Sequence, residues 1–569
     1  EGSTIVNGKT IDKIKVIPRR TYSQAFQGNI YIIHDDWRIY SADLMLTSAT
    51  NNINLVDTLK LSQQYVPVKD DIWMPVSTQV DFGGNVLGFV FSGYFIAVYN
   101  NYKLDQKFEP GFFNGEILRI DTAANKKDST YWSETRPIPL TRQEARDYVK
   151  KDSVFEIKNT TAYKDSAQRN DNKYNPLDHL IFTHDVHYWR TNQSIFVPPL
   201  HKIVFYNTVE GWGIDLRPTF IKKFKDYRTF TVTPALHYGF ASKLFSPSVT
   251  ANYVYDPDKR GMFYTSFGSD VIDLNDVGTR SLFFNTVSSL LYENNYVKYY
   301  RTKFGSFGYQ RELANGILWN ASLGYSNRQQ LYNVSFNHIR DVKNKEYTSN
   351  NPLAPVGAPE DDKSFLFPEH NALTFRTSVE FTFDQKYITR PTGKVYVPSR
   401  YPKVLVSYRK GINNLLGSDV NYDFTSVDIW QDDVPLGLYG HSSFKMTAGT
   451  FFNRKTLYFM DYNHFLGNMG TTFDPTYVGS FHFLPFYEFS TDRAFLEAHY
   501  FHNFSGLFFN KIPFIRKLKL EEVAGINYLN SNNRRNYYEL YAGIKRLFFR
   551  VDYGISYAGN KKYIQGFRL

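Results

Sequence analysis

Long segments with a period of two fill the chain from about Val209 to its end, and this pattern limits the fold more than any other feature. In ILWNASLGYS, the apolar residues Ile317 and Trp319 share one side of the chain. Asn320 and Ser322 share the opposite side. Successive side chains of a β-strand point to opposite faces, so the pattern predicts strands with one apolar and one polar face.

The length of these segments favours a membrane barrel over a soluble β-sandwich, which also alternates. We count about sixteen segments of roughly 10 residues or more, whereas strands of soluble domains usually have about 5 or 6. In hydrocarbon every backbone N–H and C=O needs an internal partner, so only helices and closed sheets cross a bilayer. We therefore expect a transmembrane β-barrel of about 16 antiparallel strands. The alternative is a large soluble β protein.

The composition agrees with a ring-rich membrane surface. Aromatic residues make up 18% of the chain, yet its mean hydropathy is only -0.42. Tyr and Trp favour the two membrane interfaces, which accounts for 44 Tyr without a ligand. The chain has no Cys, which excludes disulfides, Cys-ligated zinc and a Cys nucleophile. Its net charge of +11 is scattered and includes no basic run, so we expect no nucleic-acid partner.

One uncharged run, from Phe82 to Tyr102, is long enough for a membrane helix. It contains four glycines, and most of its other residues are aromatic or β-branched. Such residues disfavour helices and favour strands. We therefore predict two strands that meet near the glycines.

The composition divides the chain into three parts. Residues 1–130 alternate over short segments and predict a periplasmic antiparallel β domain. Residues 131–202 predict a helical connector, which contains a capping box at Thr141 and Glu144. Residues 203–569 are the predicted outer-membrane barrel, whose longest loop, about Gln329 to Asn371, should lie on the outer side. The chain begins at Glu1 without an apolar leader, so we expect that a signal peptide or a longer N-terminal part precedes it.

Several strings resemble those of one family: KIKVIPRR, GNIYIIHDDWRIYSADLMLT, YWSETRPIPLTRQEARDYVKKDS, FYNTVEGW and YFHNFSGLFFNKIPFIRKLKLEEVAG. They resemble Bacteroidota outer-membrane proteins labelled carboxypeptidase-like regulatory domain-containing, whose main body is a domain of unknown function. The resemblance implies that a small regulatory-type β-sandwich precedes this chain. It also implies a first part similar to the lipoprotein-carrier half-barrels of the periplasm. The last part is similar in strand number to the outer-membrane insertases, but the arginine-glycine-aromatic loop motif of insertases is missing.

Two pairs of histidines with a three-residue spacing are candidate metal ligands. His499 and His502 lie in a segment that predicts a strand, so they should point to opposite faces, His499 to the lumen. His184 and His187, in the connector, are weak metal candidates, because a loop there could turn both rings inward. We expect no bound metal and no cofactor.

Candidate catalytic groups are few. The sequence has no GxSxG motif, and Asp461 with His464 is the one acid and histidine pair we consider at a barrel rim. Other charges should face the lumen and form structural ion pairs, since each would cost about 2 to 4 kcal/mol in lipid. These lumen charges are Asp215, Arg217, Arg376, Glu380, Arg550 and Asp552.

Together these features predict a non-enzymatic component of an outer-membrane biogenesis, export or protein-assembly complex. Its barrel would contact outer-membrane lipid and lipopolysaccharide. Its periplasmic domain would bind a protein or lipoprotein partner through an open sheet face or edge. Two alternatives are a transport pore for a solute or polymer and an outer-membrane hydrolase that uses Asp461 and His464.

Overall fold

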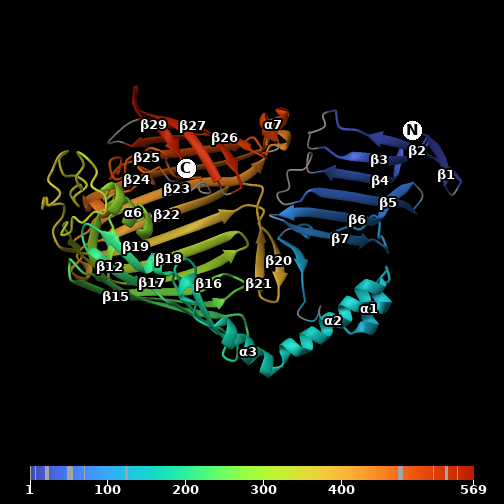
Figure 1. Cartoon of the computed structure of the whole chain (residues 1–569), viewed down its shortest axis with the longest axis horizontal. Coiled ribbons are helices and arrows are strands. Elements are labelled where there is room, and N and C mark those ends of the chain that lie inside the picture. Colours follow the sequence, from blue (N-terminus) through green and yellow to red (C-terminus); the bar gives the residue numbers. More distant parts are fainter. Residues whose placement is uncertain are drawn as a thin grey trace.

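The computed structural model shows two β-sheet parts joined by a helical segment (Figure 1). It describes residues 2–6, 8–19, 25–47, 56–69, 71–86, 88–113, 115–121, 123, 126–471, 478–516, 518–531, 536–547 and 549–569. Strands dominate both parts, so the predicted all-β class is confirmed.

The first part is an open antiparallel sheet whose seven strands lie in chain order. They are β1 (Ser3–Val6), β2 (Lys9–Val16), β3 (Gln27–Ile33), β4 (Arg38–Thr47), β5 (Thr58–Lys69), β6 (Ile72–Val86) and β7 (Phe89–Val98). The uncharged run therefore forms two paired strands, as predicted. Gly88 lies in their turn at φ 92°, which favours glycine. Among the described residues, no helix is long and apolar enough to cross a membrane.

Helices connect the two sheets. They are α1 (Ser129–Thr135), α2 (Arg142–Asn159), α3 (Thr161–Asp171) and α4 (Pro176–His179). The predicted capping box begins α2: the Glu144 N–H donates to Thr141 Oγ1 at 3.2 Å, and the Thr141 N–H donates to the Glu144 carboxylate at 2.8 Å. Helices α1 to α3 bury no residue, and each begins with a side-chain cap, from Asp128, Thr141 and Thr160 respectively.

The second part is an antiparallel sheet whose strand order returns from β29 to β9, the order of a closed barrel. Its strands are β9 (His184–Tyr188), β10 (Gln193–Val197), β11 (Val204–Asn207), β12 (Gly211–Leu216), β13 (Thr219–Lys223), β14 (Thr229–Gly239), β15 (Leu244–Asp256), β16 (Gly261–Asp273), β17 (Tyr299–Ala314), β18 (Ile317–Gln330), β19 (His370–Thr382), β22 (Lys403–Ile412), β23 (Asn421–Pro435), β24 (His441–Thr456), β25 (Phe495–Asn503), β26 (Glu521–Ser531), β27 (Tyr537–Arg546), β28 (Phe549–Ala558) and β29 (Lys561–Arg568). Strand β17 reaches 16 residues, well beyond the usual length in soluble domains.

The barrel begins earlier than predicted. Strands β9 and β10 lie within the expected connector, but β10 pairs with β13, so the barrel sheet starts at His184 instead of residue 203. Pro198 and Pro199 suggested a connector, and in the structure they separate β10 from β11. The order contains 19 strand segments within the described residues, so the expected number of about sixteen is not confirmed.

A small sheet joins the two parts. Strand β8 (Glu116–Arg119) pairs in parallel with β20 (Lys386–Arg390), which pairs with β21 (Gly393–Val397). The hairpin β20–β21 belongs to the connection between barrel strands β19 and β22. A further link lies near α7 (Pro513–Arg516), where Lys519 Nζ is 3.8 Å from Asp57 Oδ1. The open sheet is thus tied to one end of the barrel (Figure 1).

Long connections gather at the opposite end of the barrel (Figure 1). One carries α6 (Leu282–Tyr292), and another runs through residues 331–369, close to the bounds predicted for the longest loop. Side chains hold them together: Asn295 Nδ2 donates to the Thr348 carbonyl at 2.6 Å. The Tyr206 N–H donates to Thr286 Oγ1 at 2.9 Å and ties α6 to the barrel wall.

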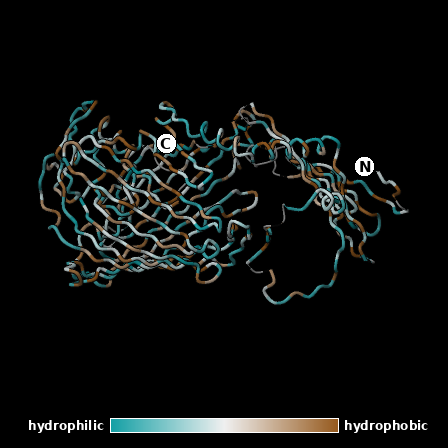
Figure 2. Tube along the Cα trace, turned by 90° about the horizontal axis from the view of Figure 1, so that it is seen from below, coloured by the Kyte–Doolittle hydropathy of each residue, from teal (hydrophilic) through white to brown (hydrophobic). Residues whose placement is uncertain are grey.

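The barrel strands carry apolar side chains outside and polar side chains inside. In β25, Leu496 and Tyr500 are exposed, while Glu497 and His499 between them are buried. Hydrophobic and hydrophilic residues alternate along the barrel strands in Figure 2. This distribution is the reverse of a soluble protein, where the apolar side is buried.

Candidate functional site

A long segment between β24 and β25 folds back into the barrel. Its two ends meet at residues 463 and 491: the Asn463 N–H donates to the Thr491 carbonyl at 2.8 Å, and the Thr491 N–H donates back at 3.0 Å. We call residues 457–494 the lumen plug. Its described parts, 457–471 and 478–494, contact strands on several sides of the barrel, so the plug crosses the lumen.

Asp461 anchors the first part of the plug. Its carboxylate accepts hydrogen bonds from Arg328 Nη1 of β18 at 2.8 Å and from the Tyr422 hydroxyl of β23 at 3.2 Å. Arg409 of β22 donates to the Asp461 carbonyl at 2.7 Å. Burial alone would raise the pKa of Asp461, but the charges of Arg328 and Arg409 hold it below its usual value. Asp461 therefore stays ionised and links three strands.

Strands on another side hold the plug by its backbone. The N–H groups of His482 and Phe483 each donate to the Glu539 carboxylate of β27 at 2.7 Å. His482 Nε2 lies 2.8 Å from an Asp552 oxygen of β28, and Arg568 of β29 donates to the His482 carbonyl at 2.6 Å. A carboxylate that accepts two backbone N–H groups leaves few polar groups unpaired in this buried region.

Aromatic packing fills the space between these anchors. Plug residues Phe481, Leu484 and Phe489 are each 1% exposed. They share one cluster with inward rings and aliphatic side chains of the barrel wall, among them Tyr422, Phe424, Phe451, Leu529 and Tyr537. Burial of each large apolar side chain contributes roughly 1.5 to 3 kcal/mol.

Sequence reasoning missed this plug. A signal is present in HFLPFYEF, a ring-rich stretch without the period of two that marks the flanking strands.

Asp461 and His464 do not form a catalytic pair. His464 accepts a hydrogen bond from the Ser490 hydroxyl at 2.7 Å through Nδ1, and its Nε2–H donates to the Phe459 carbonyl at 3.1 Å. Burial lowers the pKa of His464 to about 4. Both ring nitrogens are occupied and the ring is buried, so a substrate has no access to it.

Each of the six predicted lumen charges has a partner of opposite sign. Arg217 lies 2.8 Å from both Asp215 and Asp270, Arg376 lies 3.5 Å from Asp276, Lys403 lies 3.5 Å from Glu380, and Arg550 lies 2.6 Å from Asp552. Asp276 also lies 3.3 Å from Arg409. The network thus reaches Arg409, which binds the plug at Asp461. The purely structural role of these charges stays a prediction.

His499 and His502 lie on strand β25 and point to opposite faces, as predicted, so they cannot bind one ion together. His499 contacts Glu497 and Asn527 at 2.8 and 2.9 Å, whereas His502 points to the other face and contacts Ser442 at 2.8 Å.

The loop that could turn His184 and His187 inward does not form here, because both lie on strand β9 and point to opposite faces.

Among the described residues, one group of three potential metal ligands lies close together: Glu293, His338 and Asp341. Glu293 is buried at the end of α6, and its Oε1 lies 3.2 Å from His338 Nδ1. Asp341 is exposed. The contact between Glu293 and His338 joins the end of α6 to the 331–369 loop.

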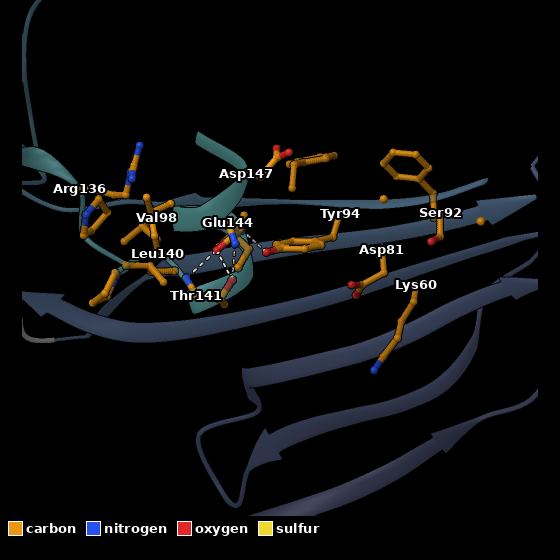
Figure 3. A pocket seen from close by; sticks show the side chains of 18 of the residues that line it. Lys60, Asp81, Ser92, Tyr94, Val98, Arg136, Leu140, Thr141, Glu144 and Asp147 are labelled. Carbon is orange, nitrogen blue, oxygen red and sulfur yellow. Dashed lines mark hydrogen bonds between the residues drawn. The ribbon is translucent and has the colours of Figure 1, made fainter. Parts of the chain in front are cut away.

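A cleft of about 1270 Å³ lies over strands β4 to β7 of the open sheet and is bounded on one side by the segment before α2 and the first turns of α2 (Figure 3). Lys60, Asp81, Ser92 and Tyr94 line it from the sheet. Residues 136–141 and the first turns of α2 line the opposite wall. The Tyr94 hydroxyl donates to the Glu144 carboxylate and holds the two walls together.

Comparison with known families gives two matches. The C-terminal domain of a family of unknown function (DUF5686) matches residues 177–544, and the other domain of that family matches residues 1–102. The predicted domain of unknown function is thus found, while the carboxypeptidase-like regulatory label stays a prediction. No curated protein matches the chain.

Two solved barrels show a weak likeness. The crystal structure of BamA from Haemophilus ducreyi lacking POTRA domains 1-3 is 10% identical, with a TM-score of 0.36, and the match covers 90% of this chain and 88% of that one. A triple mutant of Rhodopseudomonas blastica porin is 9% identical, with a TM-score of 0.26, over 65% of this chain and 94% of that one.

Proposed function

Since the chain belongs to the DUF5686 family, whose function is unknown, we propose a function from its structure. The protein is a non-enzymatic barrel of the outer membrane with a filled lumen. It anchors an open sheet in the periplasm, and this sheet binds a polypeptide partner within an outer-membrane biogenesis, export or assembly complex.

The observation that carries this proposal is the reversed distribution of side chains in the barrel. Phe267, Leu323 and Leu540 lie half exposed on the outside of strands whose inner faces hold buried charges. An apolar exterior of this extent is unfavourable in water, at roughly 25 cal/mol per Å² of apolar surface. Lipid and lipopolysaccharide would remove this cost, and the closed strand order satisfies the backbone.

The lumen plug favours an anchor over a transport pore. It is held at Asp461 and His482 by ionic contacts and between them by packed rings, so leaving the lumen would break many contacts at once. The buried surroundings of His464 also support a role without catalysis.

Two measurements test the proposal. The folded protein in detergent should migrate anomalously on an unheated gel and shift on boiling, as closed membrane barrels do. In planar bilayers it should stay silent. A chain that remains soluble without detergent would refute the membrane assignment, and steady single-channel currents would favour the pore.

A further inference from the structure

The two faces of the open sheet differ in polarity. The strand register places one row across the sheet: Val16, Leu44, Leu61, Val80 and Phe95. The neighbouring row on the opposite face is Lys15, Asn29, Asp43, Ser62, Gln79 and Ile96. A sheet with one apolar face normally buries that face against another layer. Here Ile14 and Phe95 remain 41% and 55% exposed.

The two edges of this sheet differ in how they are protected. Natural proteins protect edge strands by shortness, charge, proline or a bulge. Strand β1 has four residues, whereas β7 has ten residues, FVFSGYFIAV, with no charge and no proline. In the described part of the chain, β7 pairs with β6 alone. About half of its backbone groups therefore face outward without a strand partner.

The cleft beside β7 has a wall that cannot complete the sheet. The segment of residues 136–140 in this wall contains Pro137 and Pro139, which have no N–H to donate. Thr141 and Glu144 already bind each other in the capping box. This wall thus adds no strand to the β7 edge.

The charges around the cleft balance. Its lining includes three basic and three acidic side chains: Lys60, Arg136, Lys151, Asp81, Glu144 and Asp147. A neutral ligand fits this lining better than a polyanion or a polycation. The uncharged side chains of β7 favour the same kind of ligand.

We propose that β7 accepts an extended segment of a partner polypeptide along its free edge, as an eighth antiparallel or parallel strand next to the cleft. The bound segment is uncharged and alternates. Its apolar side chains extend the row that ends at Phe95, and its small polar side chains lie toward Tyr94 and α2. Main-chain hydrogen bonds supply affinity and the alternation supplies specificity. This inference rests on the proposed role of the sheet in partner binding.

The absence of cysteine in the chain allows a direct test. Ser92→Cys places one thiol on β7 beside the cleft, and Ser3→Cys places a control thiol on the other edge strand. Probes are ten-residue peptides of alternating Val and Thr, each with one Cys at a different position. The full-length protein in detergent is mixed with each peptide in a glutathione redox buffer, and mixed disulfides are counted by mass spectrometry.

The yield of mixed disulfide with Ser92→Cys should alternate between high and low as the peptide Cys moves by one position, because alternate side chains of a bound strand face the thiol. It should exceed trapping at Ser3→Cys at least tenfold. Equal trapping at both thiols, or trapping without this period, would overturn the proposal. A phospholipid vesicle that protects Ser92→Cys from alkylation, while the peptides do not, would assign the cleft to lipid instead.

A second variant tests the edge itself. Ile96→Lys adds a charge of the kind that blocks edge pairing, and it should lower the trapping about tenfold while the heat-dependent gel shift of the barrel persists. Persistent trapping with Ile96→Lys contradicts strand addition. Loss of the gel shift would instead contradict the proposed membrane barrel. The failure of strand addition and the failure of the barrel proposal therefore give different results.

Discussion

The open sheet and the barrel share an alternation of side chains with a period of two, but they differ in which face of the sheet is enclosed. In the sheet, the row that ends at Phe95 forms an uncovered apolar face, and the whole layer buries few residues, among them Ile11 and Ile33. In the barrel, the inner face is enclosed, and the lumen plug packs against its rings and pairs with its charges. A period of two therefore sets which side chains share a face, while closure decides which face is enclosed.

The largest effect should follow from removal of the plug. Asn463 and Thr491 are paired neighbours, so residues 464–490 can be replaced by two glycines without straining the barrel wall. We expect this variant to conduct ions in planar bilayers, because Phe481, Leu484 and Phe489, which pack inside the lumen, are gone. A silent variant that keeps its gel shift would show that the loops with α6 and residues 331–369 close the barrel by themselves.

Loss of Asp461 should destabilise the barrel by about 3 to 5 kcal/mol, since Asp461→Ala leaves Arg328 buried without its partner. Urea unfolding of the detergent-folded protein measures this change. The control is Asp226→Asn, which breaks an exposed pair with Arg228 and should cost about 1 kcal/mol or less. Similar costs for the two variants would mean that Arg328 finds water or another partner in the lumen.

A matched pair of phenylalanines tests which surface meets lipid. Phe267, in the middle of β16, is 56% exposed, and Phe95 on the open sheet is 55% exposed. We expect Phe267→Arg to cost about 2 to 4 kcal/mol, because a charge at mid-depth must enter hydrocarbon. Phe95→Arg in water should cost about 1 kcal/mol. If both substitutions lower the free energy of unfolding equally in vesicle-folded protein, Phe267 does not face lipid.

The buried His464 should make the stability of the barrel depend on pH. Its folded pKa of about 4 lies below the ordinary value of 6.5, so between these values only the unfolded chain binds the proton. Stability therefore falls as the pH drops from 7 to 5, by about 2 kcal/mol for this residue. His464→Gln should remove that part of the slope in urea unfolding. An unchanged slope would mean that the ring is already exposed in the folded barrel.

Local rules predicted many elements from the sequence. The capping box at Thr141 and Glu144, the two strands within Phe82–Tyr102 and the opposite orientation of His499 and His502 all follow from neighbours a few residues apart. The start of the barrel could not be predicted from such neighbours. Pro198 and Pro199 suggest the end of a connector, but in the structure they lie between two barrel strands, β10 and β11.

The lumen plug depends on contacts that no local pattern contains. Asp461 and Arg328 are 133 residues apart, and Tyr487 and Asp273 are 214 apart. Only a curved sheet brings such positions together. Asp461 and His464 appear in the sequence as a possible acid and base, but the folded chain engages each with a different partner.

The sequence by itself determined the period of two, the long strands and the absence of charge along β7, because these depend on successive side chains and their chemistry. The tertiary structure alone decided that the polar face of one sheet closes around the aromatic plug and that the apolar face of the other stays open. The physical reason is that burial depends on what lies across from a face, and that neighbour comes from distant parts of the chain.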